Sequence, residues 1–167
     1  MDFDISKNRQ YLSNCFLLLI PIIIWNLVFI PYLPDTYSPA VFNNNIPAFI
    51  AKSETILRVI VFALPLTMKL SLQTKTQKIG FSIYSLGLAF YFLSWVFQIY
   101  YSRSVWSMNL FGFTAPAYTT ILFFIGIGLI GKSTFMKISN MSIIYISISV
   151  LFVVFHSMHA YIVFQRL

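Results

Sequence analysis

The sequence predicts an all-α protein embedded in a membrane, and three observations support this prediction. Hydrophobic residues make up 59% of the 167 residues and charged residues only 9%, far below the roughly 25% typical of soluble domains. The hydrophobic residues form long runs instead of the alternating pattern of a transmembrane β-barrel. The few Lys and Arg residues stand singly between these runs, as is typical of membrane topology. We therefore expect a polytopic membrane helix bundle with five transmembrane helices, forming one domain over residues 1–167.

The first two expected transmembrane helices contain prolines that disturb regular winding. Residues 14–31 form an uncharged run, long enough to cross about 30 Å of hydrocarbon, with Pro21 inside it. Residues 56–72 form a shorter run that carries both Arg58 and Pro65. Because proline removes a backbone hydrogen bond and clashes with the preceding turn, we expect a kink in the first helix.

The other three hydrophobic runs cover residues 79–101, 116–131 and 141–164. We expect Thr114 to cap the fourth helix, because its hydroxyl can accept a hydrogen bond from a backbone N–H of the first turn. A Ser-Asn pair at residues 139–140 is a similar start signal for the fifth helix. With an odd number of spans, the N-terminus and the C-terminus lie on opposite sides of the membrane.

The longest connection, residues 32–52, joins the first two expected helices. It contains several large apolar side chains, among them Phe42 and Phe49, which a merely hydrated loop does not need. Loops of this length are often functional, so we expect this outer loop to lie on the membrane surface or to fold as a lid over a pocket. The simpler alternative is an interfacial belt of aromatic residues.

The distribution of positive charge predicts a cytoplasmic N-terminus and a C-terminus outside. In this orientation seven of the 11 Lys and Arg residues lie on the cytoplasmic side and four lie outside, which agrees with the positive-inside rule. The cytoplasmic group comprises Lys7, Arg9, Lys69, Lys75, Lys78, Lys132 and Lys137, and the outer group comprises Lys52, Arg58, Arg103 and Arg166. We expect the protein to reside in the plasma membrane as a multi-pass protein.

Four ionisable residues lie in or beside hydrophobic runs, where charged groups are costly, so they mark a candidate functional site. Glu54 and Arg58 are four residues apart, with the acid first. His156 and His159 are three residues apart. Each pair therefore shares one face of its helix, and both pairs lie towards the outer side in the predicted orientation. Together with Arg58, the residues that we assign to ligand binding at this level are Asn26, Trp95, Gln98, Trp106 and Tyr118.

The two histidines are the residues best suited to acid–base catalysis, because imidazole titrates near neutral pH. We therefore name His156, His159 and Glu54 as candidate catalytic residues, with the carboxylate orienting one of the rings. Arg58 would hold an anionic group of the ligand, since its planar fork matches carboxylate and phosphate. Each pair also has a purely structural explanation: an interfacial ion pair for the acid and the arginine, and hydrogen bonds between helices for the histidines.

The sequence predicts neither a bound metal nor an organic cofactor. Zinc needs three or four ligands, and only Glu54 and Asp35 could join the two histidines on the outer side. Gly126, Gly128 and Gly131 mimic part of a dinucleotide-binding motif, but no strand precedes them, so we expect a helix-packing surface instead. The isolated lysines do not form the basic patch that binds nucleic acid.

Three classes of function are compatible with this pattern. The favoured one is the binding or transport of a small amphipathic or lipid-like molecule in a polar pocket near the outer face. The second is a membrane-embedded enzyme acting on a lipid-like substrate, and the third is a non-catalytic subunit of a membrane complex. Besides membrane lipids and such a ligand, the small size of the bundle favours a second copy of the chain or a partner membrane subunit. No catalytic or transport motif in the sequence identifies a known family.

Overall fold

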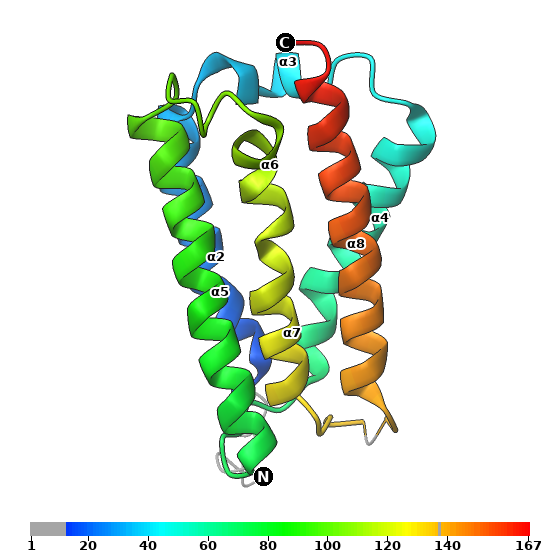
Figure 1. Cartoon of the computed structure of the whole chain (residues 1–167). Helices are drawn as coiled ribbons and strands as arrows, with labels where there is room; N and C mark the ends of the chain where they lie inside the picture. The colour runs from blue at the N-terminus through cyan, green and yellow to red at the C-terminus, as the bar shows by residue number, and fades with distance from the viewer. Residues whose placement is uncertain (1–12, 137) are drawn as a thin grey trace, which may run out of the picture.

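The computed structural model describes residues 13–136 and 138–167, and it shows helices that run between two ends of a bundle (Figure 1). Within these residues there is no β-strand, and four helical segments are long and apolar enough to cross a membrane. The prediction of an all-α chain with apolar, membrane-length helices is confirmed. These four segments are Cys15–Tyr32, Lys75–Tyr100, Leu110–Ile130 and Met141–Phe164. Three charges used for the orientation lie outside the described residues: Lys7, Arg9 and Lys137.

The first helical segment changes its winding next to Pro21. It begins as the 3-10 helix η1 (Cys15–Leu19), continues as α2 (Ile20–Phe29) and ends as the short 3-10 helix η2 (Ile30–Tyr32). Pro21 stands in the first turn of α2, where a missing N–H costs no hydrogen bond of that helix. The expected disturbance therefore takes the form of a transition from 3-10 to α winding.

The connection after this segment is itself partly helical. It contains η3 (Asp35–Tyr37) and the one-turn helix α3 (Pro39–Phe42), which lie at the end of the bundle that also carries the C-terminus (Figure 1). The chain then enters α4 (Ala48–Ala63), which begins directly after Pro47. The last five residues of the expected 32–52 loop are thus part of a helix, because proline ends one segment and permits a new helix to start behind it.

The second expected helix is displaced towards the N-terminus of the chain. α4 begins eight residues before the expected start at residue 56, and it continues into the 3-10 helix η4 (Leu64–Thr67) instead of reaching residue 72. The expectation followed the apolar run, whereas the helix also includes the polar turn around Glu54. Pro65 lies at the start of η4, where the α-helical hydrogen-bond pattern ends.

Beyond η4 the backbone is extended and is held by two other segments at the N-terminal end of the bundle. The Cys15 N–H donates to the carbonyl oxygen of Met68 at 2.9 Å, and the Lys69 N–H donates to that of Ser133 at 2.8 Å. We call these three hydrogen-bonded segments, residues 13–15, 67–70 and 133–135, the clasp. Its hydrogen bonds keep residues 68–72 out of a helix, which explains why the second helix is shorter than expected.

One further helix begins earlier than expected because its cap lies upstream of the apolar run, whereas another begins where the sequence predicts. α5 (Lys75–Tyr100) starts four residues before residue 79, at a reciprocal capping box in which the Thr74 side chain accepts from the Gln77 N–H and the Gln77 side chain accepts from the Thr74 N–H. α8 (Met141–Phe164) has the expected bounds, but Asn140 makes no side-chain capping bond there.

The fourth helix begins at Asn109 and not near Thr114. The side chain of Asn109 accepts a hydrogen bond from the Gly112 N–H at 2.8 Å and caps α6 (Leu110–Tyr118). The expected cap, Thr114, lies inside this helix, and its hydroxyl donates to the Leu110 carbonyl at 2.7 Å. After one transitional residue the chain continues as α7 (Thr120–Ile130), so the span is six residues longer than expected at its start.

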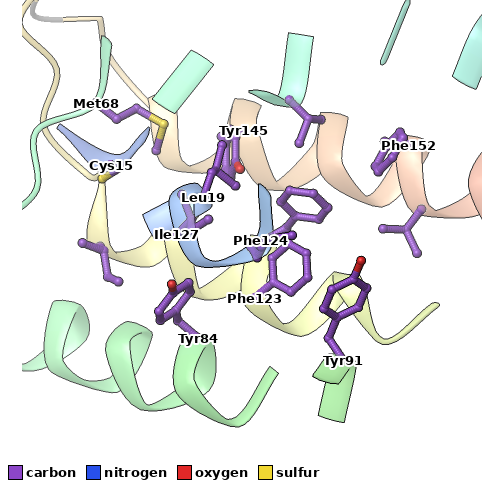
Figure 2. Packing of buried hydrophobic residues seen from close by; sticks show 14 of the residues in the cluster. Cys15, Leu19, Met68, Tyr84, Tyr91, Phe123, Phe124, Ile127, Tyr145 and Phe152 are labelled. Atoms are coloured by element: carbon purple, nitrogen blue, oxygen red, sulfur yellow. The ribbon is translucent and has the colours of Figure 1, made fainter. Parts of the chain in front are cut away.

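Glycines permit the closest helix contacts. On α7, Gly126 lies against Tyr84 of α5, Gly128 against Ile146 of α8, and Gly131 against Met68 of the clasp. The three glycines therefore meet three different elements, as a helix-packing surface requires. Around them lies a core of aromatic and aliphatic side chains, including Phe123, Phe124 and Tyr145 (Figure 2). α4 packs mainly on α8, whereas α5 packs mainly on α7.

We predict that Gly87→Ala destabilises the bundle. A Cβ atom at Gly87 would lie 2.4 Å from the backbone nitrogen of Phe123, so α5 and α7 would have to move apart. Overpacking of this kind costs about 1–3 kcal/mol, measurable as a lower thermal transition temperature of the detergent-solubilised protein. The control is Ser85→Ala, an exposed position on the same helix. Equal stability of the two variants would contradict the close α5–α7 contact.

Candidate functional site

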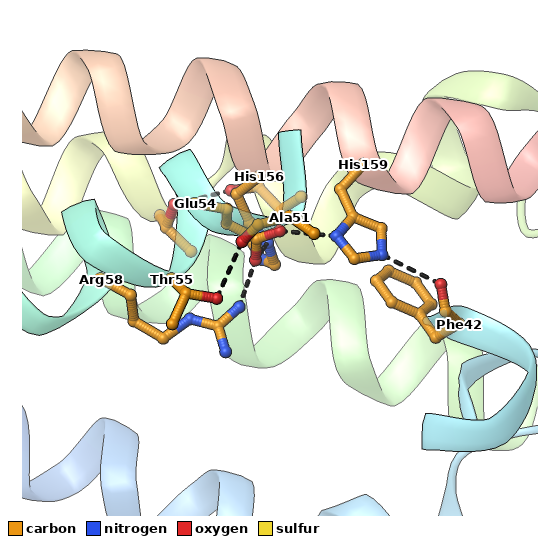
Figure 3. Close-up of polar contacts among 9 residues, drawn as sticks. Phe42, Ala51, Glu54, Thr55, Arg58, His156 and His159 are labelled. Carbon is orange, nitrogen blue, oxygen red and sulfur yellow. Dashed lines mark hydrogen bonds and ion pairs between the residues drawn. The ribbon is translucent and has the colours of Figure 1, made fainter. Parts of the chain in front are cut away.

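The candidate site is built around the carboxylate of Glu54, which is only 3% exposed. Its oxygen Oε1 accepts hydrogen bonds from Arg58, one turn later on α4, and from Nδ1 of His156 on α8 at 2.9 Å (Figure 3). Its other oxygen, Oε2, lies 2.6 Å from Nδ1 of His159. The packing of α4 on α8 therefore brings all four predicted ionisable residues together.

The helix periodicity explains why both histidines reach the same carboxylate. His156 and His159 are three residues apart on α8, so both face α4. The ring of His156 stacks on Phe152, with centroids 5.4 Å apart and planes at 9°. These contacts hold the two imidazoles on either side of Glu54.

His159 also contacts the α2–α4 connection, residues 33–47. Its Nε2 lies 2.9 Å from the carbonyl oxygen of Phe42 in α3, and the two rings stack at 4.8 Å (Figure 3). Arg166, near the C-terminus, donates to the carbonyl of Asn44 in the same connection. Tyr37 donates its hydroxyl to the Phe113 carbonyl of α6 at 2.8 Å. The connection is thus held over this end of the bundle by side-chain contacts.

A cavity of about 410 Å³ opens beside Glu54, a volume within the range of about 300–1,000 Å³ common for small-molecule sites. Its walls come from α2, α4, α5, α6, α7, α8 and the α2–α4 connection, and most of them are apolar. Its titratable and charged lining residues are Tyr37, Glu54, Arg58, Tyr91, His156 and His159. Burial raises the pKa of Tyr37, so this phenol stays a neutral donor.

Among the residues assigned to ligand binding, Arg58, Asn26 and Trp95 line the cavity. The side-chain oxygen of Asn26 accepts from the hydroxyl of Tyr91 at 2.5 Å, so part of its polarity is already used within the wall. Arg58 differs, because its side chain is 53% exposed although it contacts a buried carboxylate. The structure thereby leaves a cation accessible at the cavity.

The structure does not bring the other three assigned residues to the cavity. Gln98 is buried and donates from Nε2 to the Gly112 carbonyl at 2.8 Å, which ties α5 to α6. Trp106 lies in the loop between these helices, and Tyr118 lies at the end of α6; neither lines the cavity. These residues were assigned to the site because the sequence predicts that they lie at the same depth in the membrane. Whether a side chain also points into the cavity depends on how the helices pack.

Sequence reasoning missed several wall residues. Tyr91 lies four residues before Trp95 and therefore on the same face of α5, which is a signal that the sequence does contain. Phe42 and Tyr37 come from the α2–α4 connection, for which only a general covering role was expected. Phe113 enters through the early start of α6, which the sequence did not reveal.

The described part of the chain contains no group of three His, Cys, Asp or Glu residues that could hold a metal ion. Asp35, considered above as a further ligand, does not line the cavity. Comparison with protein-family models, curated proteins and solved structures found no significant match. The function therefore has to be inferred from the geometry of the site.

Two chemical capacities follow from this geometry. Arg58 carries five N–H donors, and the hydrogen bond recorded for it is the one to Glu54, so further donors remain for an anionic ligand. The hydrogen bond from Nδ1 of His156 to Glu54 orients that imidazole, which is how carboxylates position histidines in acid–base catalysis. Both capacities depend on the buried carboxylate.

We predict that Glu54→Ala strongly destabilises the protein. Removing the carboxylate leaves Arg58 and the buried His159 without their shared acceptor, and breaking a buried ionic network in this way typically costs about 3–5 kcal/mol. Chemical denaturation followed by tryptophan fluorescence measures the loss. Lys52→Ala, an exposed position on the same helix, should change the free energy of unfolding little. A stable Glu54→Ala variant would show that the network is dispensable for folding.

Proposed function

We propose that this protein is a multi-pass plasma-membrane protein that binds or transports a small amphipathic ligand with an anionic group. The observation that carries the proposal is the accessible guanidinium of Arg58 at an otherwise mostly apolar cavity. An arginine with spare donors recognises carboxylate, sulfonate or phosphate groups. The apolar walls would then contact the hydrocarbon part of the ligand.

The composition of the walls supports an amphipathic ligand over a purely polar one. Ile22 of α2 and Phe123 and Phe124 of α7 line the cavity together with the ionic cluster of Glu54, Arg58, His156 and His159. Binding sites commonly combine such apolar walls with a few convergent polar groups that orient the ligand. A small polar ion would leave these walls uncovered, whereas a hydrocarbon chain would bury them.

The proposal includes five spans with the N-terminus in the cytoplasm. In addition to the four apolar segments described above, α4 and η4 together form a span, the second along the chain. They run between the two ends of the bundle beside α8 (Figure 1). Lys69, Lys75, Lys78 and Lys132 lie near the clasp end, which agrees with a cytoplasmic position for that end. The cavity, bounded by the α2–α4 connection, then opens near the outer face.

A membrane-embedded enzyme is the second candidate, favoured by the hydrogen bond between Glu54 and Nδ1 of His156. In such an enzyme, Nε2 of His156 would exchange a proton with the substrate while Arg58 holds its anionic group. The third class, a non-catalytic subunit, requires no ligand. These classes predict different molecules bound to the purified protein.

Native mass spectrometry of the gently solubilised protein tests the proposal. We expect a bound small molecule that Arg58→Ala loses almost completely and that Arg103→Ala, in an exposed loop, retains. The physical reason is that Arg58 is the accessible cation among the described residues that line the cavity, so its removal leaves the anionic group of the ligand without a partner. Absence of any adduct from the intact wild-type protein would instead favour the subunit.

The same spectra distinguish binding from catalysis. A binding protein retains the same adduct mass in His156→Gln, whereas an enzyme would accumulate unreacted substrate of a different mass in that variant.

Cysteine labelling tests the orientation. In a Cys15→Ala background, Ala40→Cys in α3 and Ser139→Cys before α8 each provide an exposed thiol. We expect a membrane-impermeant maleimide to label Ala40→Cys in intact cells and Ser139→Cys only after lysis. The reverse pattern would contradict a cytoplasmic N-terminus, and labelling of both in intact cells would contradict the separation of the two ends by a membrane.

A further inference from the structure

Both ring nitrogens of His159 face oxygen atoms that accept hydrogen bonds. Nδ1 lies 2.6 Å from a carboxylate oxygen of Glu54, and Nε2 lies 2.9 Å from the carbonyl oxygen of Phe42. A neutral imidazole carries a single N–H and can satisfy only one of them. The carbonyl of Phe42 can only accept, so Nε2 must carry a proton. A second proton must then lie between Nδ1 and Oε2.

This second proton is required wherever it resides. If Glu54 is ionised, the proton belongs to an imidazolium; if Glu54 is protonated, its O–H donates to Nδ1. Without the proton, a carboxylate oxygen and an imidazole lone pair would face each other at 2.6 Å in a buried site, which is electrostatically unfavourable. The observed arrangement is therefore the proton-loaded form of the Glu54–His159 pair.

The proton determines the charge of the cavity. With it, the Glu54–His159 pair is neutral, a neutral His156 suffices to donate its Nδ1 proton, and Arg58 contributes one positive charge. Without it, the pair carries one negative charge, which cancels that of Arg58. Tyr37 and Tyr91 are the only other titratable lining residues, and the described lining residues of α2, α3, α6 and α7 include none.

We infer that the site binds its anionic ligand together with a proton held between Glu54 and His159, an inference that rests on the proposed function. An anion meets a positive cavity when the proton is present and an uncharged one when it is absent. Because Glu54 and His159 are buried, the charge of this pair acts on a nearby anion more strongly than it would in water, so the ligand and the proton stabilise each other's binding. By linkage, the ligand must then increase the site's affinity for the proton by the same factor.

The same proton also acts on the wall of the cavity. Phe42 and Pro39 of α3 line the cavity, and the Phe42 carbonyl is held by His159. After proton loss, the single remaining N–H of His159 can serve Glu54 or Phe42 but not both. One of these contacts then breaks, so that His159 no longer binds either the carboxylate, which Arg58 and His156 still contact, or the Phe42 carbonyl of α3. Ligand release is thereby coupled to a change at the outer opening.

The test uses 1-decanesulfonate, whose sulfonate does not titrate, so that any proton uptake comes from the protein. Wild-type protein in phosphatidylcholine nanodiscs is titrated by calorimetry between about pH 5 and about pH 9, the range over which histidines change charge. Parallel titrations in two buffers of different ionisation enthalpy give the number of protons taken up per ligand. Empty nanodiscs correct for partition into lipid, and decyltrimethylammonium is the cationic control.

We expect proton uptake per sulfonate to be zero at low pH, where the pair is already loaded, to reach a maximum between the proton affinities of the free and the ligand-bound site, and to fall again at higher pH. Affinity should fall over the same interval by about tenfold or more, within the usual range of coupling between two sites. His159→Gln should bind without this uptake. His156→Gln, which alters the other imidazole at the same carboxylate, should retain it.

Two results would overturn the inference and leave the proposed function intact: sulfonate binding that depends on Arg58 but not on pH, or uptake that persists in His159→Gln. Failure of the sulfonate to bind wild-type protein above the empty-nanodisc signal, or binding unchanged in Arg58→Ala, would overturn the proposed function and the inference with it. The wild-type titration decides the question even if a histidine variant does not fold.

Discussion

A carboxylate buried at Glu54 is the constraint on which the arrangement of the cavity end of the bundle depends. An ionised carboxyl group away from water is tolerated only when hydrogen bonds and opposite charge surround it. Arg58 supplies one donor from the same helix, and the two histidines supply two more from α8. Because His159 is in turn bound to Phe42, this single acid links α4, α8 and the α2–α4 connection. In this region, the need of a buried carboxylate for hydrogen bonds and opposite charge therefore determines how the helices pack, more than the burial of apolar surface does.

The other half of the bundle follows a different principle. α5 and α7 approach closely because Gly80, Gly87 and Gly126 leave no side chain between their backbones. Aromatic residues such as Phe123 and Phe124 then fill the centre, and their outer surfaces form walls of the cavity. α5 packs closely on α7 on one side, and α4 is joined to α8 by the ionic contacts on the other. A space remains between these two helix pairs. This space is the proposed ligand site.

Much of the fold was predictable from the sequence, because long apolar runs identify helices and periodicity identifies faces. Helix starts were not, since caps such as Asn109 and the Thr74 box lie outside the apolar runs that were used to draw the spans. The ionic cluster was predictable because buried charges need partners. The failure of Gln98 to reach the cavity was not predictable, since its orientation depends on how α5 meets α6. Roles assigned to these side chains stay predictions.

The two ends of the molecule are fastened by bonds of different kinds. At the clasp, main-chain hydrogen bonds join segments 13–15, 67–70 and 133–135, and no side-chain titration weakens them. At the opposite end, the connection is held by side chains of α8, the C-terminal turn and η3. Any spreading of the helices therefore has its pivot at the clasp and its largest amplitude at the cavity. Loss of the side-chain bonds at the cavity end would therefore let the helices separate there while the clasp still joins them at the other end.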